Sequence, residues 1–306
     1  MFIGHGLLAF AIAASVAARR GWSAERALTV GAVTGLFATL PDVDMAYALV
    51  GLAGGAEGLF SASDAFWSAA HIVHRAVTHS LVIGAVAAVG FAAWAARARR
   101  DVLAVAVGTL SGLVAVAATA SGGLGAAIMV VFVAGGLGIV RVARSAGFGT
   151  RTILVAALLG LLSHPFGDLL TGTPPALLYP VDVTLVGDRV ALAADPTLHL
   201  LGAFFVELTT LWVALVVYAR LRGWRVRALV QPRAALGAAY AGAIFTIPAP
   251  TLQLSWPFVF SVLGVGIIGA PLRWNRQRRT RWRTVATALA AVTLAAVAYT
   301  AAYLLV

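Results

Sequence analysis

The sequence predicts an all-α membrane protein, a polytopic transmembrane helical bundle of about ten helices. Hydrophobic residues make up 61% of the 306 residues and charged residues only 11%, and the mean hydropathy is +0.95. A soluble globular domain has a far more polar composition. The apolar runs are continuous rather than alternating, which favours helices over strands. At about 20 residues for each span, the chain has room for about eight to ten spans.

Ten apolar segments, bounded by Gly, Pro or Arg clusters, are predicted as helices. They are 2–18, 27–49, 65–96, 102–119, 124–140, 152–170, 198–219, 234–250, 256–272 and 284–305. The first segment is predicted as a retained helix, because Arg19 and Arg20 follow its apolar run, whereas a signal peptide carries its charge before that run. Between the sixth and seventh segments, "DVTLVGDRVAL" predicts a small hairpin around Gly187-Asp188.

The arginines predict the orientation of the helices. All 22 basic residues are arginine, and 20 of them fall in alternate connections, at 19–26, 97–100, 141–151, 220–233 and 273–283. The connections between these, near 51–64, 120–123, 171–197 and 248–257, hold only Arg189. By the positive-inside rule, the arginine side is cytoplasmic and both termini lie outside. Topology thus explains the net charge of +11, and no nucleic-acid partner is expected.

Two parts of the chain differ in their polar residues. Residues 1–219 are predicted as a seven-helix core that carries the functional site and the outer loop 171–197. Residues 220–306 are predicted as three accessory transmembrane helices, with almost no unusual polar residues inside them. The chain contains no cysteine, so neither disulfides nor thiolate metal ligands are possible.

Ionisable residues inside the predicted spans are few, and each is costly in a membrane. They are His5, Asp42, Asp44, His71, His74, Arg75, His79, His164, Asp168 and Glu207. Counted at 1.5 Å per residue from the nearest inner arginine, six of them on five helices lie at about 20 to 27 Å. These six are His5, Asp42, His79, His164, Asp168 and Glu207. In a hydrocarbon core of roughly 30 Å they share one level near the outer face, which predicts a common site.

The residue types at this level indicate a metal site. Imidazoles and carboxylates bind zinc or manganese, and several together suit one or more metals that activate water. His164 and Asp168 are four residues apart and share a helix face, with Pro165 expected to weaken that helix. In "LPDVD", Pro41 is expected to interrupt the helix so that the two aspartates converge. His74 and His79, five apart, would diverge on a regular helix.

Three motifs occur in order along the chain: "LPDVD", "HRAVTHS" and "SHPFGDLLTGTPPALLYP". With His5, they resemble the motifs of the YdjM-like family of integral membrane proteins, described as predicted metal-dependent hydrolases. The resemblance spans roughly residues 1–210. That family is similar in motif order to zinc-dependent phospholipase C and P1-type nucleases, all-helical enzymes that cut phosphodiesters with a zinc cluster.

The resemblance implies a set of ligands in this chain. The implied ligands are His5, Asp42, His79, His164 and Asp168, with His74 and Asp44 as ligands or as groups behind them. Two departures leave the number of metals open. Ala76 stands where the family often has Gly, and Met45 stands where it commonly has a histidine.

The candidate catalytic residues are Arg75, Glu207 and Asp44. The planar fork of Arg75 would clamp a phosphate, or it would form a structural ion pair with one of the aspartates of "LPDVD". Glu207 would be a ligand, the general base for water, or a neutral buried carboxyl. Thr78 and Ser80 are expected to position ligands by hydrogen bonds. His71 is expected to be a structural or surface residue, and His199 a surface residue. The alternative for His5, His79 and His164 is an ordinary interfacial or interhelical polar contact.

The predicted function is hydrolysis by a multi-pass protein of the plasma (inner) membrane, with its site facing the periplasm. The expected substrate is a phosphoester, a phospholipid or lipid-linked phosphate, cleaved with water activated by a divalent metal. Zinc is the expected metal, as one or more ions, with manganese as the alternative. A transporter of divalent metal or protons is the first rival, and would need polar residues across the inner half of the bundle. The second is a non-catalytic membrane protein with a structural metal.

Overall fold

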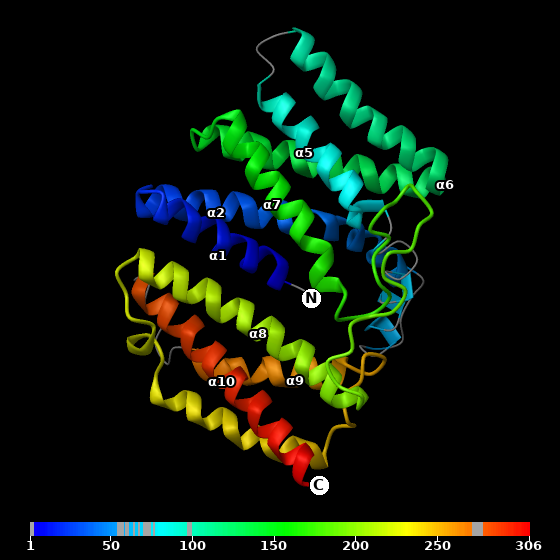
Figure 1. Ribbon diagram of the computed structural model, residues 1–306. Helices are drawn as coiled ribbons and strands as arrows, with labels where there is room; N and C mark the ends of the chain where they lie inside the picture. The colour runs from blue at the N-terminus through cyan, green and yellow to red at the C-terminus, as the bar shows by residue number, and fades with distance from the viewer. Residues whose placement is uncertain are drawn as a thin grey trace.

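The computed structural model describes residues 3–53, 58, 61–63, 65–66, 68–69, 75, 77–96, 100–270 and 278–306. Within these residues the chain is all helical and contains no strand, which confirms the predicted fold class. The chain runs back and forth as antiparallel helices (Figure 1). Four segments are long and apolar enough to cross a membrane, namely Arg100–Ser145, Thr150–Asp168, Pro196–Leu221 and Thr280–Leu305.

The first two helices form a closely packed antiparallel pair, α1 (Gly4–Arg19) and α2 (Ala24–Thr39). They approach closely because glycine faces glycine: a Cβ on Gly35 would lie 2.7 Å from the carbonyl oxygen of Gly6. As predicted from Pro41, the helical run then breaks into the 3₁₀ helix η1 (Pro41–Tyr47) and the short α3 (Ala48–Leu52). This second part is bent by 49° from α2, and the bent pair counts as a fifth candidate span.

The third predicted helix, 65–96, is wrong as a single helix. The regular helix α5 spans only Leu81–Ala95, after a 3₁₀ turn, η2 (Val77–His79). Ser80 begins α5, because its Oγ accepts hydrogen bonds from the backbone N–H groups of Val82 (3.1 Å) and Ile83 (3.3 Å). Residues 77–80 therefore form an irregular segment that precedes the helix.

The fourth and fifth predicted helices are two arms of α6 (Arg100–Ser145). The arms meet at Gly122, whose φ of 69° and ψ of −165° are not helical, and Figure 1 shows the chain turning back there. Next comes α7 (Thr150–Asp168), which continues through Pro165 to its last residue. The connection 171–197 contains no strand, so the predicted hairpin around Gly187 is wrong.

The rest of the chain contains α8 (Pro196–Leu221), η3 (Val226–Ala228), η4 (Pro232–Phe245), α9 (Trp256–Gly264), η5 (Val265–Gly269) and α10 (Arg278–Leu305). These helices pack around a second apolar core that includes Phe258 and Tyr299, with ring centroids 5.1 Å apart. The first core joins α1, α2, α5, α6 and α7, and Phe91 lies at its centre. By packing, α8 belongs to the second core, although it also contacts α1. The division of the chain at residue 219 remains a prediction.

Candidate metal centre

The polar residues singled out in the sequence gather at one end of the bundle. The ends of α2 and α7 and the beginnings of α1, α5 and α8 point toward this end, as does the loop 171–197 (Figure 1). Asp42, His79, His164 and Asp168 each present a ligand atom there, and the four atoms all lie within 4.8 Å of one another. They come from η1, η2 and the last turns of α7, so three separate elements build the group.

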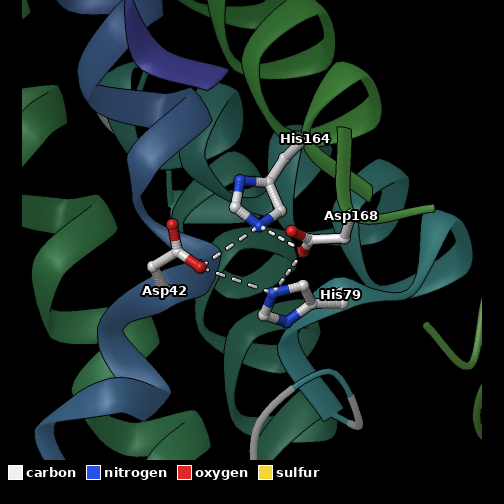
Figure 2. Close-up of side chains that lie close together, drawn as sticks. All are labelled: Asp42, His79, His164 and Asp168. Atoms are coloured by element: carbon white, nitrogen blue, oxygen red, sulfur yellow. Dashed lines mark ion pairs between the residues drawn. The ribbon is translucent and has the colours of Figure 1, made fainter. Parts of the chain in front are cut away.

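The distances within this group suit one metal ion. Nε2 of His79 lies 3.6 Å from Oδ1 of Asp42 and 3.3 Å from Oδ2 of Asp168. Nε2 of His164 lies 3.5 Å from each of the same two oxygens (Figure 2). A tetrahedral zinc site with ligand bonds of about 2.1 Å has edges of about 3.4 Å. The four residues therefore fit the metal that their chemistry implies.

A backbone carbonyl orients His164. Its Nδ1 lies 2.6 Å from the carbonyl oxygen of Ala38, at the end of α2. Because a carbonyl only accepts, Nδ1 carries the proton, and in the neutral ring the lone pair is on Nε2. Nε2 points into the group of four and forms no hydrogen bond there. Metal-binding histidines are held in this way, with the second ring nitrogen donating to a carbonyl or carboxylate.

His79 is oriented by Thr78 and Asp44. Its Nδ1 lies 3.0 Å from Oγ1 of Thr78 and 3.4 Å from Oδ2 of Asp44, and the Thr78 hydroxyl donates to the same oxygen at 3.1 Å. Asp42 and Asp44 thus converge on one imidazole, as predicted, but from opposite nitrogens. Asp42 lies on the side of the metal group. Asp44, whose side chain is fully buried, lies behind His79 and fixes its ring.

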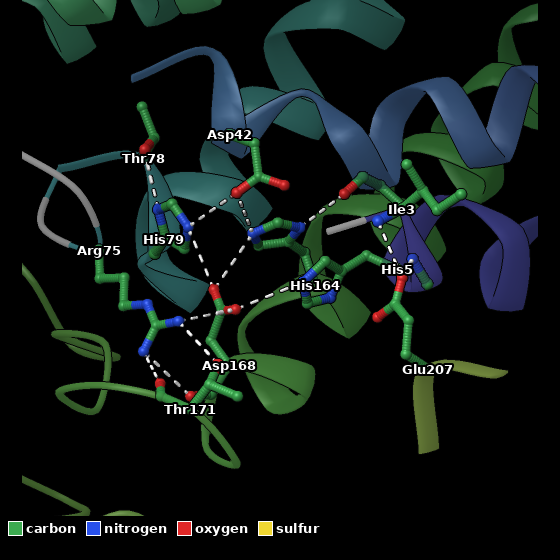
Figure 3. A network of polar contacts seen from close by, with 12 residues as sticks. Ile3, His5, Asp42, Arg75, Thr78, His79, His164, Asp168, Thr171 and Glu207 are labelled. Carbon is green, nitrogen blue, oxygen red and sulfur yellow. Dashed lines mark hydrogen bonds and ion pairs between the residues drawn. The ribbon is translucent and has the colours of Figure 1, made fainter. Parts of the chain in front are cut away.

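Asp168 connects the group of four to two further residues. Its Oδ2 faces the two imidazoles, whereas its Oδ1 lies 3.4 Å from Nε2 of His5 and 3.4 Å from Nη2 of Arg75 (Figure 3). His5 is 4% exposed, and its ring centroid is 4.1 Å from that of His164. His5 therefore reaches the centre through Asp168 and is not one of the four converging donors.

The guanidinium of Arg75 is engaged by the protein. Nη1 donates to the backbone carbonyls of Asp168 (3.3 Å), Thr171 and Thr173 (3.0 Å), and Nη2 donates to Oγ1 of Thr171 (3.0 Å). The backbone of Arg75 has a φ of 71°, a conformation that a bulky residue rarely adopts. Gly172 lies beneath it with a φ of 66°, a conformation that favours glycine, and a Cβ there would lie 2.7 Å from Nη1. These contacts make Arg75 a clamp on the loop after α7, and its ion pair is with Asp168 rather than within "LPDVD". Its predicted role as a phosphate clamp remains a prediction.

Glu207 lies at the beginning of α1. Its Oε1 accepts from the backbone N–H groups of Ile3 (3.0 Å) and Gly4 (2.8 Å), and it is not among the four converging donors. Neither predicted role, metal ligand or base, is supported by this position. Both contacts are with backbone groups about 200 residues away in sequence, so no local pattern could have indicated them.

Several other predictions have mixed outcomes. Thr78 positions a ligand as expected, whereas Ser80 caps α5 and donates to the carbonyl of Tyr179 at 2.7 Å. His199 is buried rather than exposed, and its Nδ1 accepts from the backbone N–H of Leu192 at 3.1 Å. His71 and His74 lie outside the described residues, so the predicted role of His74 as a ligand remains a prediction.

With this geometry in view, comparison with known proteins decides the family. The model of the YdjM inner membrane protein family matches residues 1–304. The chain belongs to this family. The match covers almost the whole chain, including the C-terminal helices that lie outside the three motifs. No curated protein and no solved structure matches the chain.

Proposed function

We propose that this member of the YdjM family is a membrane-bound, metal-dependent hydrolase. One observation carries the proposal: two carboxylates and two imidazoles from three elements converge within 4.8 Å, and the imidazoles are held by groups behind them. His79, His164 and Asp168 are almost completely buried. Burying such groups together is unfavourable unless a charge compensates them, and a divalent cation would do so.

One of the four residues is accessible. The side chain of Asp42 is 23% exposed, whereas those of His79, His164 and Asp168 are at most 1% exposed. Catalytic metal sites keep one coordination position open to water or substrate, unlike closed structural sites. When bound, a divalent metal would supply the Lewis acidity that activates water for hydrolysis. Water and substrate would approach from the side of Asp42, while the buried imidazoles and Asp168 exclude solvent from the other side.

We propose a phosphoester of a lipid or a lipid-linked phosphate as the substrate. The proposal is supported by the motif order shared with phospholipase C-like enzymes and by a site at one end of an apolar helical bundle. Zinc is the proposed metal and manganese the alternative, because both accept imidazole and carboxylate ligands. The periplasmic side follows from the positive-inside rule applied to the arginines.

The distribution of buried charge favours an enzyme over a transporter. Within the described residues, the His, Asp, Glu and Arg side chains that are less than 9% exposed are His5, Asp44, His79, His164, Asp168 and His199. They lie in the first turns of α1 and α8, in η1 and η2, and in the last turns of α7, and these parts face the same end of the bundle (Figure 1). A transport path would need polar groups near the middle of the bilayer and on toward the other side. One-sided access is the arrangement expected of a hydrolase.

The test is to purify the protein, measure its metal content by elemental analysis, and assay phosphodiesterase and lipid phosphatase turnover. We expect stoichiometric metal and metal-dependent turnover in the wild type, and loss of both in His164→Ala. Ser163→Ala is the matched control, because among the described residues its hydroxyl bonds only to Gly160 in the same helix. A folded wild type without metal would contradict the proposal. Metal without turnover of any phosphoester would instead support the structural-metal alternative.

A further inference from the structure

The first turn of α1 is held by a side chain from the other half of the molecule. The first N–H groups of a helix have no partner within the helix and need an acceptor elsewhere. Ile3, which precedes α1, provides no side-chain cap. Oε1 of Glu207, on α8, accepts from the N–H groups of Ile3 and Gly4 instead (Figure 3). A carboxylate at this position is also favoured by the helix dipole.

His5 is the next residue in this turn. Its direction is set by the backbone that Glu207 holds, and it places Nε2 3.4 Å from Oδ1 of Asp168. The other side of the same turn is fixed at Gly6, where a Cβ would lie 2.6 Å from Cγ2 of Thr39. The beginning of α1 is thus held between α2 and α8, and Glu207 is its polar attachment to α8.

We infer that Glu207 is a positioning residue for His5, and through His5 for the metal ligand Asp168. Its Oε1 is used by two backbone groups, and its Oε2 is buried without a hydrogen bond to the described residues. Because α8 packs in the second core, Glu207 makes the C-terminal helices part of the support of the metal centre. The inference rests on the proposed function, since His5 matters only if Asp168 binds a metal.

The first experiment measures how well His5 is held. In metal-free protein, the rate of carbethoxylation of His5 by diethyl pyrocarbonate is followed by mass spectrometry. We expect Glu207→Ala to raise this rate at least about tenfold, because an uncapped first turn frays. Glu207→Gln should stay close to the wild type, since its amide oxygen accepts the same two N–H groups. Thr209→Val is the matched control, because Thr209 is exposed on α8 and its hydroxyl bonds only to Phe205 within the part of the chain that the structure describes.

The second experiment measures the affinity for zinc by competition with a chelator. Groups that orient metal ligands typically contribute about 10- to 100-fold to metal affinity, and we expect a loss in this range for Glu207→Ala. The double variant His5→Ala/Glu207→Ala should bind zinc as His5→Ala does, because Glu207 acts through His5. Glu207→Gln should keep both zinc and turnover, whereas loss of turnover with zinc retained would identify a general base.

Three results would overturn the inference. The first is an unchanged labelling rate of His5 in Glu207→Ala and in Glu207→Asp, a milder variant that retains a carboxylate on a shorter side chain. The second is a loss of zinc affinity in the double variant that equals the product of the losses in the two single variants. The third is loss of turnover with zinc retained in Glu207→Gln. If the wild type binds no metal, the proposed function fails, but the labelling of His5 still decides whether Glu207 holds this turn.

Discussion

The two ends of the bundle differ in whether their charged side chains are buried or exposed. At the metal end, a group of charged and ionisable side chains is buried and its members contact one another: Asp168 alone contacts three histidines and an arginine. At the other end, most of the arginines that the structure describes are exposed, and two lie over aromatic rings. The guanidinium of Arg26 is 4.9 Å from the ring centroid of Trp22, and that of Arg222 is 5.6 Å from that of Tyr218.

This difference separates two uses of charge in a membrane protein. Exposed arginines are solvated singly, so each contributes to orientation in the membrane independently of the others. Buried groups must compensate one another, so changing one alters the free energy of all its neighbours. Replacements at the metal end should therefore have large and coupled effects, and replacements at the arginine end should have small and additive ones.

The largest effect is expected for Asp168→Ala. This change leaves His5, His79 and Arg75 without the carboxylate that they share, and breaking a buried charge network typically costs about 3–5 kcal/mol. We expect loss of bound metal and a strongly lowered unfolding temperature in detergent. If Asp168→Ala were as stable as the wild type, replacing a buried charge would cost no more than replacing an exposed arginine, and the contrast between the two ends would be wrong.

The next largest effect is expected at Arg75, the one arginine that contacts the metal centre within the described residues. Arg75→Lys should weaken zinc binding about 10- to 100-fold, close to Arg75→Ala, because an ammonium cannot reproduce the planar fork that joins Asp168 to Thr171 and Thr173. Chelator competition measures the change. Unaltered zinc affinity with a raised KM for phosphoesters would return Arg75 to the role of a substrate clamp.

A smaller effect is expected for Ser80→Ala, beside the metal centre but outside its network. The change removes the cap of α5 and the hydrogen bond to the Tyr179 carbonyl, and loss of a helix cap typically costs about 1 kcal/mol. Thermal unfolding should report this loss, while the metal content stays that of the wild type. Ser111→Ala is the control, since Ser111 is exposed on α6 and bonds only within its own helix. Loss of metal in Ser80→Ala would show that Ser80, at the start of α5, also supports the metal centre.

The smallest effect is expected at the arginine end. Arg222→Cys should change stability by less than about 0.5 kcal/mol, as surface replacements usually do. Asp188→Cys is its counterpart in the exposed loop 171–197, and the chain has no other cysteine. A membrane-impermeant maleimide added to intact spheroplasts should label position 188 and spare position 222. The reverse pattern would overturn the predicted orientation.

Some features of the site were readable from local sequence. His164 and Asp168 share a face of α7 because four residues make about one turn, and Pro41 interrupts the helical run after α2 because proline lacks the N–H that a helix interior requires. The start of α5 at Ser80 also had a local signal, a serine directly before an apolar run. The predicted helix 65–96 passed over it because apolar residues also occur before Ser80, at 65–67, 69–70, 72–73 and 76–77, and hydropathy alone does not locate a break.

The sequence by itself determined the class of protein and the depth of its polar residues along the helices. Hydropathy and the rise per residue are read from consecutive residues and do not depend on which helices pack together. Only the tertiary structure decided how those residues divide their roles. Asp42 and Asp44 contact opposite nitrogens of His79, Arg75 clamps a loop, and Glu207 caps a helix that begins about 200 residues earlier. These roles depend on which atoms meet across different elements, and a one-dimensional pattern does not contain that information.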